Sequence, residues 1–166
     1  IVGAAPEDAR TFVSVEDFTK VPTAESLKKT RQSWVAAVLA ARRIQWLQSG
    51  PIADREYVTS FYFGKVLTAR IDNELSSPRA LDDSYLNEVG ASAKGMFALE
   101  YLLFGRRPNP AAPTNAATAS VLALFSRPES PRRGQYALVL ARDLEAKSRH
   151  LANDWTASGD QVIAAK

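Results

Sequence analysis

Residues 94–105, with the sequence KGMFALEYLLFG, decide the fold and contain the most unusual position of the chain. The stretch is almost wholly apolar and closes at Gly105, yet it carries one acid, Glu100. The residues three and four positions away on either side share a helical face with this acid. They are Met96, Phe97, Leu103 and Phe104. The stretch therefore predicts a helix that turns a carboxylate toward the interior or the edge of a bundle.

Apolar residues at helical spacing continue through most of the chain. Thr23 is suited to cap a helix whose apolar stripe starts at Trp34 and which Gly50-Pro51 ends. Further helices are predicted over residues 57–75, 82–104 (with a break near Gly90), 114–125 and 132–155. The last of these has a stripe formed by Tyr136, Leu140, Leu144, Leu151 and Trp155. No segment alternates as a strand would, so the sequence predicts an all-α protein, an antiparallel bundle of about four main helices.

The first 22 residues have a weaker pattern than the rest. Pro6 and Pro22 bracket an acidic stretch without a clear apolar stripe. We expect residues 1–22 to form an arm with at most a short helix, and residues 23–166 to form the bundle. The chain starts at Ile1 without a basic and apolar leader. We therefore expect a trimmed product from which a signal peptide has been removed, and a fragment of a longer protein.

The composition narrows the function classes. The 166 residues are 46% hydrophobic and 23% charged, with a net charge of +3, which is too mild for a dedicated nucleic-acid-binding domain. The chain has no cysteine and a single histidine, His150, which excludes thiolate metal sites and histidine-rich ones. No apolar run is long enough to span a membrane.

The chemistry available to Glu100 is limited by its helix. A carboxylate among apolar side chains must find a cation, hydrogen-bond donors or a metal, or else take up a proton. One interpretation is a structural anchor that pairs with an arginine such as Arg42 or Arg70. The other is a metal ligand or site carboxylate. General acid–base catalysis would need a second titratable group, which this helix does not offer.

The basic pairs of the chain lie near expected helix ends or in loops. We expect them to be solvated or to cap helix C-termini. An anionic partner, such as a phosphate, a lipid headgroup or a siderophore carboxylate, is the alternative. These pairs are Arg42-Arg43, Arg106-Arg107 and Arg132-Arg133.

The stretch 94–105 resembles the signature of the imelysin family of bacterial periplasmic and envelope proteins, which includes insulin-cleaving proteases and iron-regulated uptake proteins. The family pattern is G-x-H-x-x-E followed by an apolar run and Gly. Gly95 and Glu100 match it in place, whereas Phe97 stands where the family has His. Three further elements agree in order, so the resemblance covers residues 33–155. They are Ser33-Trp34 with Gly50-Pro51, Ile71-Asp72 with Leu75, and the last helix.

The departures from the family pattern concern polar residues. A histidine three residues before a glutamate can share one metal ion or one proton with it, and Phe97 can do neither. Val38 and Gln45 also stand where the family often has Arg and Glu. Metal-dependent peptide hydrolysis would therefore lack both ligands and base. Glu100 remains as a structural carboxylate or as part of an altered binding cleft.

The resemblance implies a function outside the cytoplasm. We expect a non-catalytic imelysin-like protein of the periplasm or envelope, a binding component in the acquisition of iron or another metal. The expected partners are the C-terminal half of the same protein and a metal ion or an iron-uptake protein; nucleic acid is not expected. One alternative is a metallopeptidase completed by the C-terminal half. Another is a helical module that docks on a protein or lipid surface without spanning the membrane.

Overall fold

The computed structural model describes residues 4–44, 61, 68–82, 84–105, 114–127 and 131–164. All regular secondary structure in these ranges is helical, which confirms the predicted all-α class. The elements are α1 (Ala4–Lys20), α2 (Ala24–Ile44), α5 (Thr68–Ser76), α6 (Tyr85–Glu88), the short 3₁₀ helix η1 (Ala91–Ala93), α7 (Gly95–Phe104), α8 (Thr114–Phe125) and α9 (Arg132–Ala164).

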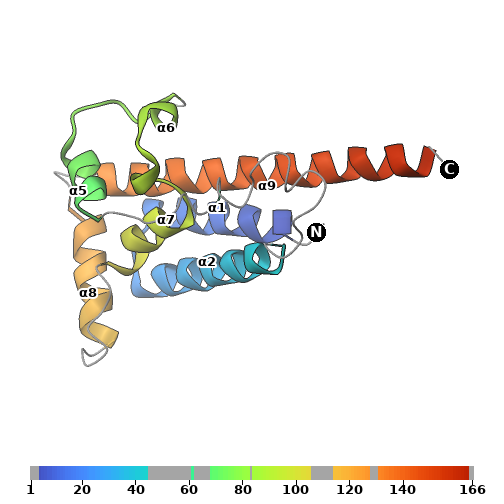
Figure 1. Cartoon of the computed structure of the whole chain (residues 1–166). Coiled ribbons are helices and arrows are strands. Elements are labelled where there is room, and N and C mark those ends of the chain that lie inside the picture. The colour runs from blue at the N-terminus through green and yellow to red at the C-terminus, as the bar shows by residue number, and fades with distance from the viewer. Residues whose placement is uncertain are drawn as a thin grey trace.

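Three long helices form the frame of the molecule (Figure 1). Helices α1 and α2 form a hairpin, and α1 also packs along α9. The short helix α7 packs against α9, α2 and α8, so residues 95–104 lie at the centre of the assembly. Helices α5 and α8 lie near the N-terminal end of α9. The C-terminal part of α9 extends past the other helices.

Helix α1 corrects the expectation for the N-terminal residues. The sequence predicts at most a short helix in residues 1–22, but α1 alone is 17 residues long. Val15 and Phe18 are fully buried, and Thr11 is only 4% exposed on the same face. Pro6 lies in the first turn, where a helix tolerates proline. The helix forms because α2 and α9 bury one face of it, which its own weak pattern does not show.

Hydroxyl groups join α1 to α2. The Thr11 hydroxyl donates to the Ser33 carbonyl at 3.0 Å, and the Thr30 hydroxyl donates to the Ser14 carbonyl at 2.8 Å. The hydroxyls of Ser14 and Ser33 lie 3.0 Å apart. Small side chains let the two backbones approach, and the hydrogen bonds between them satisfy polar groups that would be costly to bury alone.

The turn between these helices confirms the predicted cap. The Ser26 backbone N–H donates to the Thr23 hydroxyl at 3.1 Å, and the Thr23 N–H donates to the Ser26 hydroxyl at 3.0 Å. This reciprocal pair satisfies two donors that the start of α2 would otherwise leave open.

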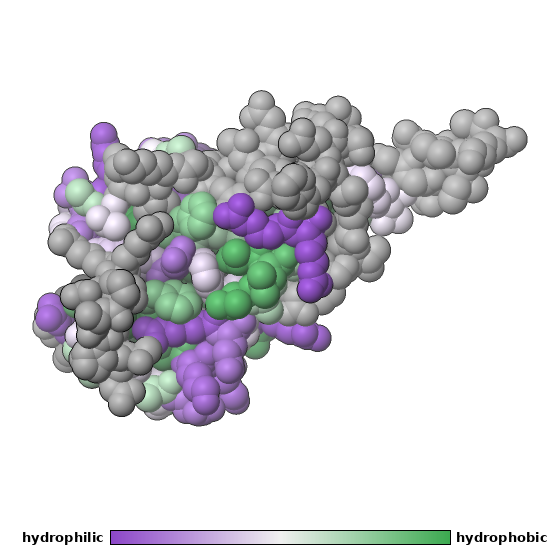
Figure 2. Space-filling view, turned by 60° about the horizontal axis from the view of Figure 1, so that its bottom comes forward, coloured by the Kyte–Doolittle hydropathy of each residue, from purple (hydrophilic) through white to green (hydrophobic). Residues whose placement is uncertain are grey.

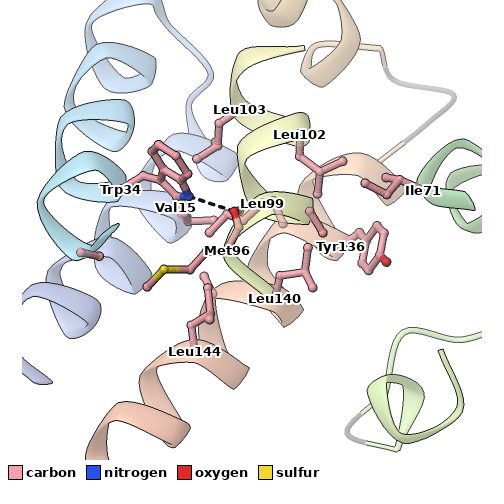
Figure 3. Packing of buried hydrophobic residues seen from close by; sticks show 14 of the residues in the cluster. Val15, Trp34, Ile71, Met96, Leu99, Leu102, Leu103, Tyr136, Leu140 and Leu144 are labelled. Carbon is pink, nitrogen blue, oxygen red and sulfur yellow. Dashed lines mark hydrogen bonds between the residues drawn. The ribbon is translucent and has the colours of Figure 1, made fainter. Parts of the chain in front are cut away.

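The core lies between α2, α7 and α9, with side chains from α1 and α5 (Figure 3). The predicted stripe of α9 is confirmed over four of its five residues, and the fifth, Trp155, is half-buried. The largest fully buried side chains are Tyr85, Tyr136, Phe18, Leu27, Ile71, Met96, Leu99, Leu102, Leu103, Leu140, Leu151 and Val15.

Several predicted boundaries can be compared with the structure. The break near Gly90 is confirmed, because residues 85–104 divide into α6, η1 and α7. Gly105 ends α7 with φ +80°, as a C-terminal glycine does. Helix α9 extends beyond the predicted end at Trp155, to Ala164. The stop at Gly50-Pro51 and most of residues 57–67 lie outside the described residues. None of the helices described is long and apolar enough to cross a membrane.

Candidate functional site

Helix α7 carries the signature residues, and it begins at Gly95, the glycine of the pattern. Gly95 is buried and has φ +75°, in the left-handed region that side chains with a β-carbon avoid. Lys94 before it is extended, with φ −118° and ψ 175°. The chain therefore turns sharply into α7 at a residue that has to be glycine, and this turn sets the phase of the helix.

That phase divides α7 into an inner and an outer face. Phe97 and Glu100 are half-buried and lie on the outer face, three residues apart. The Glu100 side chain is thus at the edge of the bundle, which is one of the two positions that the sequence predicts. Phe97 packs against the core. The inner face is buried and consists of Met96, Leu99, Leu102 and Leu103.

Helix α2 supplies the neighbouring wall. Val38 is half-buried and packs against the hydrophobic core. Gln45 lies outside the described residues. Trp34, one turn before Val38, donates its indole N–H to the Met96 carbonyl at 3.1 Å. The indole bond fixes α2 against α7 beside the signature.

An aromatic and cationic group lies at the C-terminal end of α7. The rings of Trp34 and Phe104 meet edge to face, with centroids 5.2 Å apart. The Arg31 guanidinium lies 5.0 Å from the centroid of Phe104. It also donates to the Leu103 carbonyl at 3.0 Å and to the Thr118 hydroxyl of α8 at 3.0 Å. Burial lowers the pKa of Arg31. Arg31 thus joins α2, α7 and α8.

A second arginine caps the same helix end from α9. Arg133 is 6% exposed, and its guanidinium donates to the carbonyls of Leu102 at 2.9 Å and Tyr101 at 3.2 Å. Burial lowers its pKa, against the opposing effect of Tyr101 and Asp72. Arg133 thus confirms the expectation of a helix C-terminal cap for one member of the basic pairs. Two cations at the negative end of the α7 dipole stabilise the helix that holds the signature.

The element Ile71-Asp72 has a structural role next to Glu100. Ile71 is fully buried, and Asp72 accepts a hydrogen bond of 2.7 Å from the Tyr101 hydroxyl. Tyr101 directly follows Glu100, so α5 is fixed to α7 at the signature. The hydrogen bond between Asp72 and Tyr101 thus links the Ile-Asp element to the signature helix.

Tyr85 of α6 and Tyr136 of α9 form a pair that contacts α5 and η1. The Tyr85 hydroxyl donates to the Glu74 carboxylate at 2.8 Å, and burial together with that carboxylate raises the pKa of Tyr85 to about 12. The Tyr136 hydroxyl donates to the Ala93 carbonyl, and burial raises the pKa of Tyr136 as well. The two rings meet edge to face at 5.6 Å. Both phenols stay protonated at neutral pH and hold α5, α6 and η1 to α9.

The residues present do not form a metal site around Glu100. Phe97 provides no donor, Val38 provides none, and within the described ranges no three His, Asp or Glu side chains gather in a way that could hold a metal. His150, the single histidine, is exposed on α9. The described side chains therefore do not fit a bound metal at the signature without further ligands.

The comparisons with known proteins agree with the sequence resemblance. No curated protein and no solved structure matches the chain. The family model described as imelysin matches residues 5–165, which covers α1 through α9. Because that match spans nearly the whole chain, this protein belongs to the imelysin family.

Proposed function

We propose that this chain is a non-catalytic member of the imelysin family, a binding component in the acquisition of iron or another metal in the periplasm or cell envelope. The observation that carries the proposal is the outer face of α7, where Phe97 packs against the core in place of an imidazole. A packed phenyl ring can neither bind a metal nor move a proton, so hydrolysis has no base there.

The second support is the neighbouring position on α2. Val38 is packed against the hydrophobic core. An arginine at this point would bring a charge to the signature, whereas valine adds apolar surface. Two of the polar positions of the family pattern are thus occupied by side chains that contribute to packing. The face is suited to contact with another surface rather than to chemistry.

Glu100 is the group through which a metal role would act. Its half-buried carboxylate lies beside the aromatic side chain of Phe97 at the bundle edge. One carboxylate alone binds a divalent or ferric ion weakly, since such ions take several oxygen or nitrogen ligands. In this proposal the remaining ligands come from the C-terminal half of the same protein or from an iron-uptake partner.

Isothermal titration tests the metal part of the proposal. The protein that includes the expected C-terminal half is titrated with ferric citrate, Zn²⁺ and Mn²⁺. A Glu100→Gln variant of the same protein is titrated in parallel. We expect binding of at least one ion, weakened at least about tenfold in the variant, since a ligand carboxylate is lost. A titration without heat for any ion at micromolar protein would refute the metal role, and so would equal binding by the variant.

A further inference from the structure

Helix α2 exposes aliphatic side chains on the face that points away from the bundle. Val35 is 42% exposed and Leu39 is 56% exposed, one helical turn apart. Their neighbours Trp34 and Ala37 are buried on the opposite side. An exposed valine alone would need no explanation, but two adjacent aliphatic residues on one exposed face form a small apolar surface.

Cationic side chains lie at both ends of this apolar pair. Lys28 and Lys29 precede it by two turns, and Arg42 and Arg43 follow it by one, all four exposed. Residues 28, 32, 35, 39 and 42 are spaced three and four apart, so they form one line along the helix. We call Lys28, Lys29, Val35, Leu39, Arg42 and Arg43 the α2 outer stripe.

Figure 2 turns the bottom of Figure 1 toward the viewer, and a hydrophobic area on this face lies between hydrophilic side chains above and below it. Glu25 is the one acid in α2 and lies in its first turn, before the outer stripe. The fifth cation of the helix, Arg31, is directed to Leu103 and Thr118 and takes no part in the stripe. The outer stripe is thus a positively charged surface with an aliphatic centre.

We propose that the α2 outer stripe is a docking surface for membranes that contain anionic phospholipid. Long Lys and Arg side chains reach headgroup phosphates while their methylene stems cover apolar surface. Val35 and Leu39 project far enough to enter the boundary between headgroups and acyl chains. Helix α2 would then lie along the membrane surface, and the bundle behind it would stay in water. This proposal concerns another face than the outer face of α7 and does not depend on the proposed function.

Charge and apolar area favour a membrane over other occupants. A second copy of the chain would bring the same four cations against this face, and like charges repel. A stable protein interface buries about 800 Å² on each partner around an apolar centre. Two aliphatic side chains provide little of that area. A membrane needs only several cations and shallow insertion, which is what the stripe offers.

Vesicle sedimentation tests the proposal. The protein is mixed with vesicles of phosphatidylcholine alone, or with vesicles that also contain about 30% phosphatidylglycerol, an anionic phospholipid whose surface charge attracts polybasic segments. We expect binding to the anionic vesicles only, and its loss when NaCl is raised to about 0.5 M, because salt screens surface charges. Binding to both kinds of vesicle alike, or to neither, would overturn the proposal.

Two pairs of variants locate the surface. Leu39→Glu is matched by Val21→Glu in the turn between α1 and α2, where Val21 is 63% exposed. Arg43→Glu is matched by Arg70→Glu on α5, also exposed. We expect each stripe variant to bind at least about fivefold more weakly than its control, since each cation or inserted residue adds a several-fold gain. Circular dichroism verifies that all four variants are folded.

Two further outcomes would contradict the proposal. If the controls lose as much binding as the stripe variants, the α2 outer stripe is not the docking surface. If an acidic helical peptide binds the protein while anionic vesicles do not, the occupant is a protein and the membrane proposal is wrong.

Discussion

The indole N–H of Trp34 in α2 donates to the backbone carbonyl of Met96 in α7 across 3.1 Å, inside the core and between residues 62 positions apart in the sequence (Figure 3). Met96 immediately follows the glycine of the signature, so this bond holds α2 at the start of α7. The tryptophan is 9% exposed and also meets Phe104 at the other end of the helix. One side chain therefore contacts both ends of α7.

Replacing this tryptophan should destabilise the protein. Trp34→Phe removes the indole donor and part of the buried ring, and it should lower the free energy of unfolding by about 1–3 kcal/mol. Urea denaturation followed by circular dichroism measures the change. Val35→Thr, at the exposed neighbouring position, serves as the control and should change stability by less than about 0.5 kcal/mol. Equal stability of Trp34→Phe and the control would show that the bond does not hold α7.

The arginine cap of α7 gives a second prediction. Arg133→Met keeps most of the side-chain volume but removes the donors to the Leu102 and Tyr101 carbonyls. We expect a loss of about 1.5–3 kcal/mol, the range for hydrogen bonds to a charged group. Arg127→Met, at an exposed site after α8, is the matched control. Thermal unfolding that is the same for both variants would contradict the cap.

The backbone of the signature glycine can be tested directly. Gly95→Ala places a β-carbon at φ +75° and should cost about 1–2 kcal/mol, the strain of a left-handed residue. Gly90 offers a control, because its φ is −61° and a β-carbon there would meet no atom within 4 Å. Gly90→Ala should be neutral or slightly stabilising, because alanine restricts the unfolded chain. If both substitutions have the same effect, the turn into α7 does not need a glycine.

The buried phenols predict how stability changes at high pH. Tyr85 has its pKa raised to about 12 in the folded protein, against about 10 in an unfolded chain. At a pH between these two pKa values, the Tyr85 hydroxyl has lost its proton in the unfolded state but keeps it in the folded state. The stabilisation is therefore complete below pH of about 10 and is lost as the pH rises toward about 12.

Denaturation of the wild type and of Tyr85→Phe at several alkaline pH values measures this effect. The decline in stability between pH of about 10 and 12 should be shallower in the variant, which has one such phenol fewer. Ultraviolet difference absorbance should show the corresponding loss of a late phenolate signal. A variant with the same alkaline profile as the wild type would mean that Tyr85 titrates normally.

Much of the fold follows from the spacing of apolar residues. The stripe of α9 and the glycine at the end of α7 could be predicted from local patterns. Tyr136, Leu140 and Leu144 are each four residues apart, and Gly105 stops the helix. Helix α1 could not be predicted in this way. Its face toward α2 contains hydroxyl side chains such as that of Ser14, whose hydrogen-bond partner lies on α2. Polar residues that are buried by pairing look exposed in a sequence.

The candidate site could be predicted from the sequence only where the signal lies within one helix. Glu100 and Phe97 could be recognised from the pattern of a single helix, and so could the half-buried position of the acid. The roles of Arg31 and Arg133 depend on the Leu103 and Leu102 carbonyls, which lie 72 and 31 residues away. No local pattern encodes such contacts. A general expectation that basic residues cap helix ends was the only available signal, and it left the helix unspecified.

The central claim is that this imelysin-family chain has no peptidase chemistry at the signature helix. The most direct measurement incubates the protein with the insulin B chain and Zn²⁺, with and without a chelator, and follows the peptides by mass spectrometry. The account predicts an intact B chain under both conditions. Fragments that form with Zn²⁺, disappear with the chelator and are absent with Glu100→Gln would contradict it.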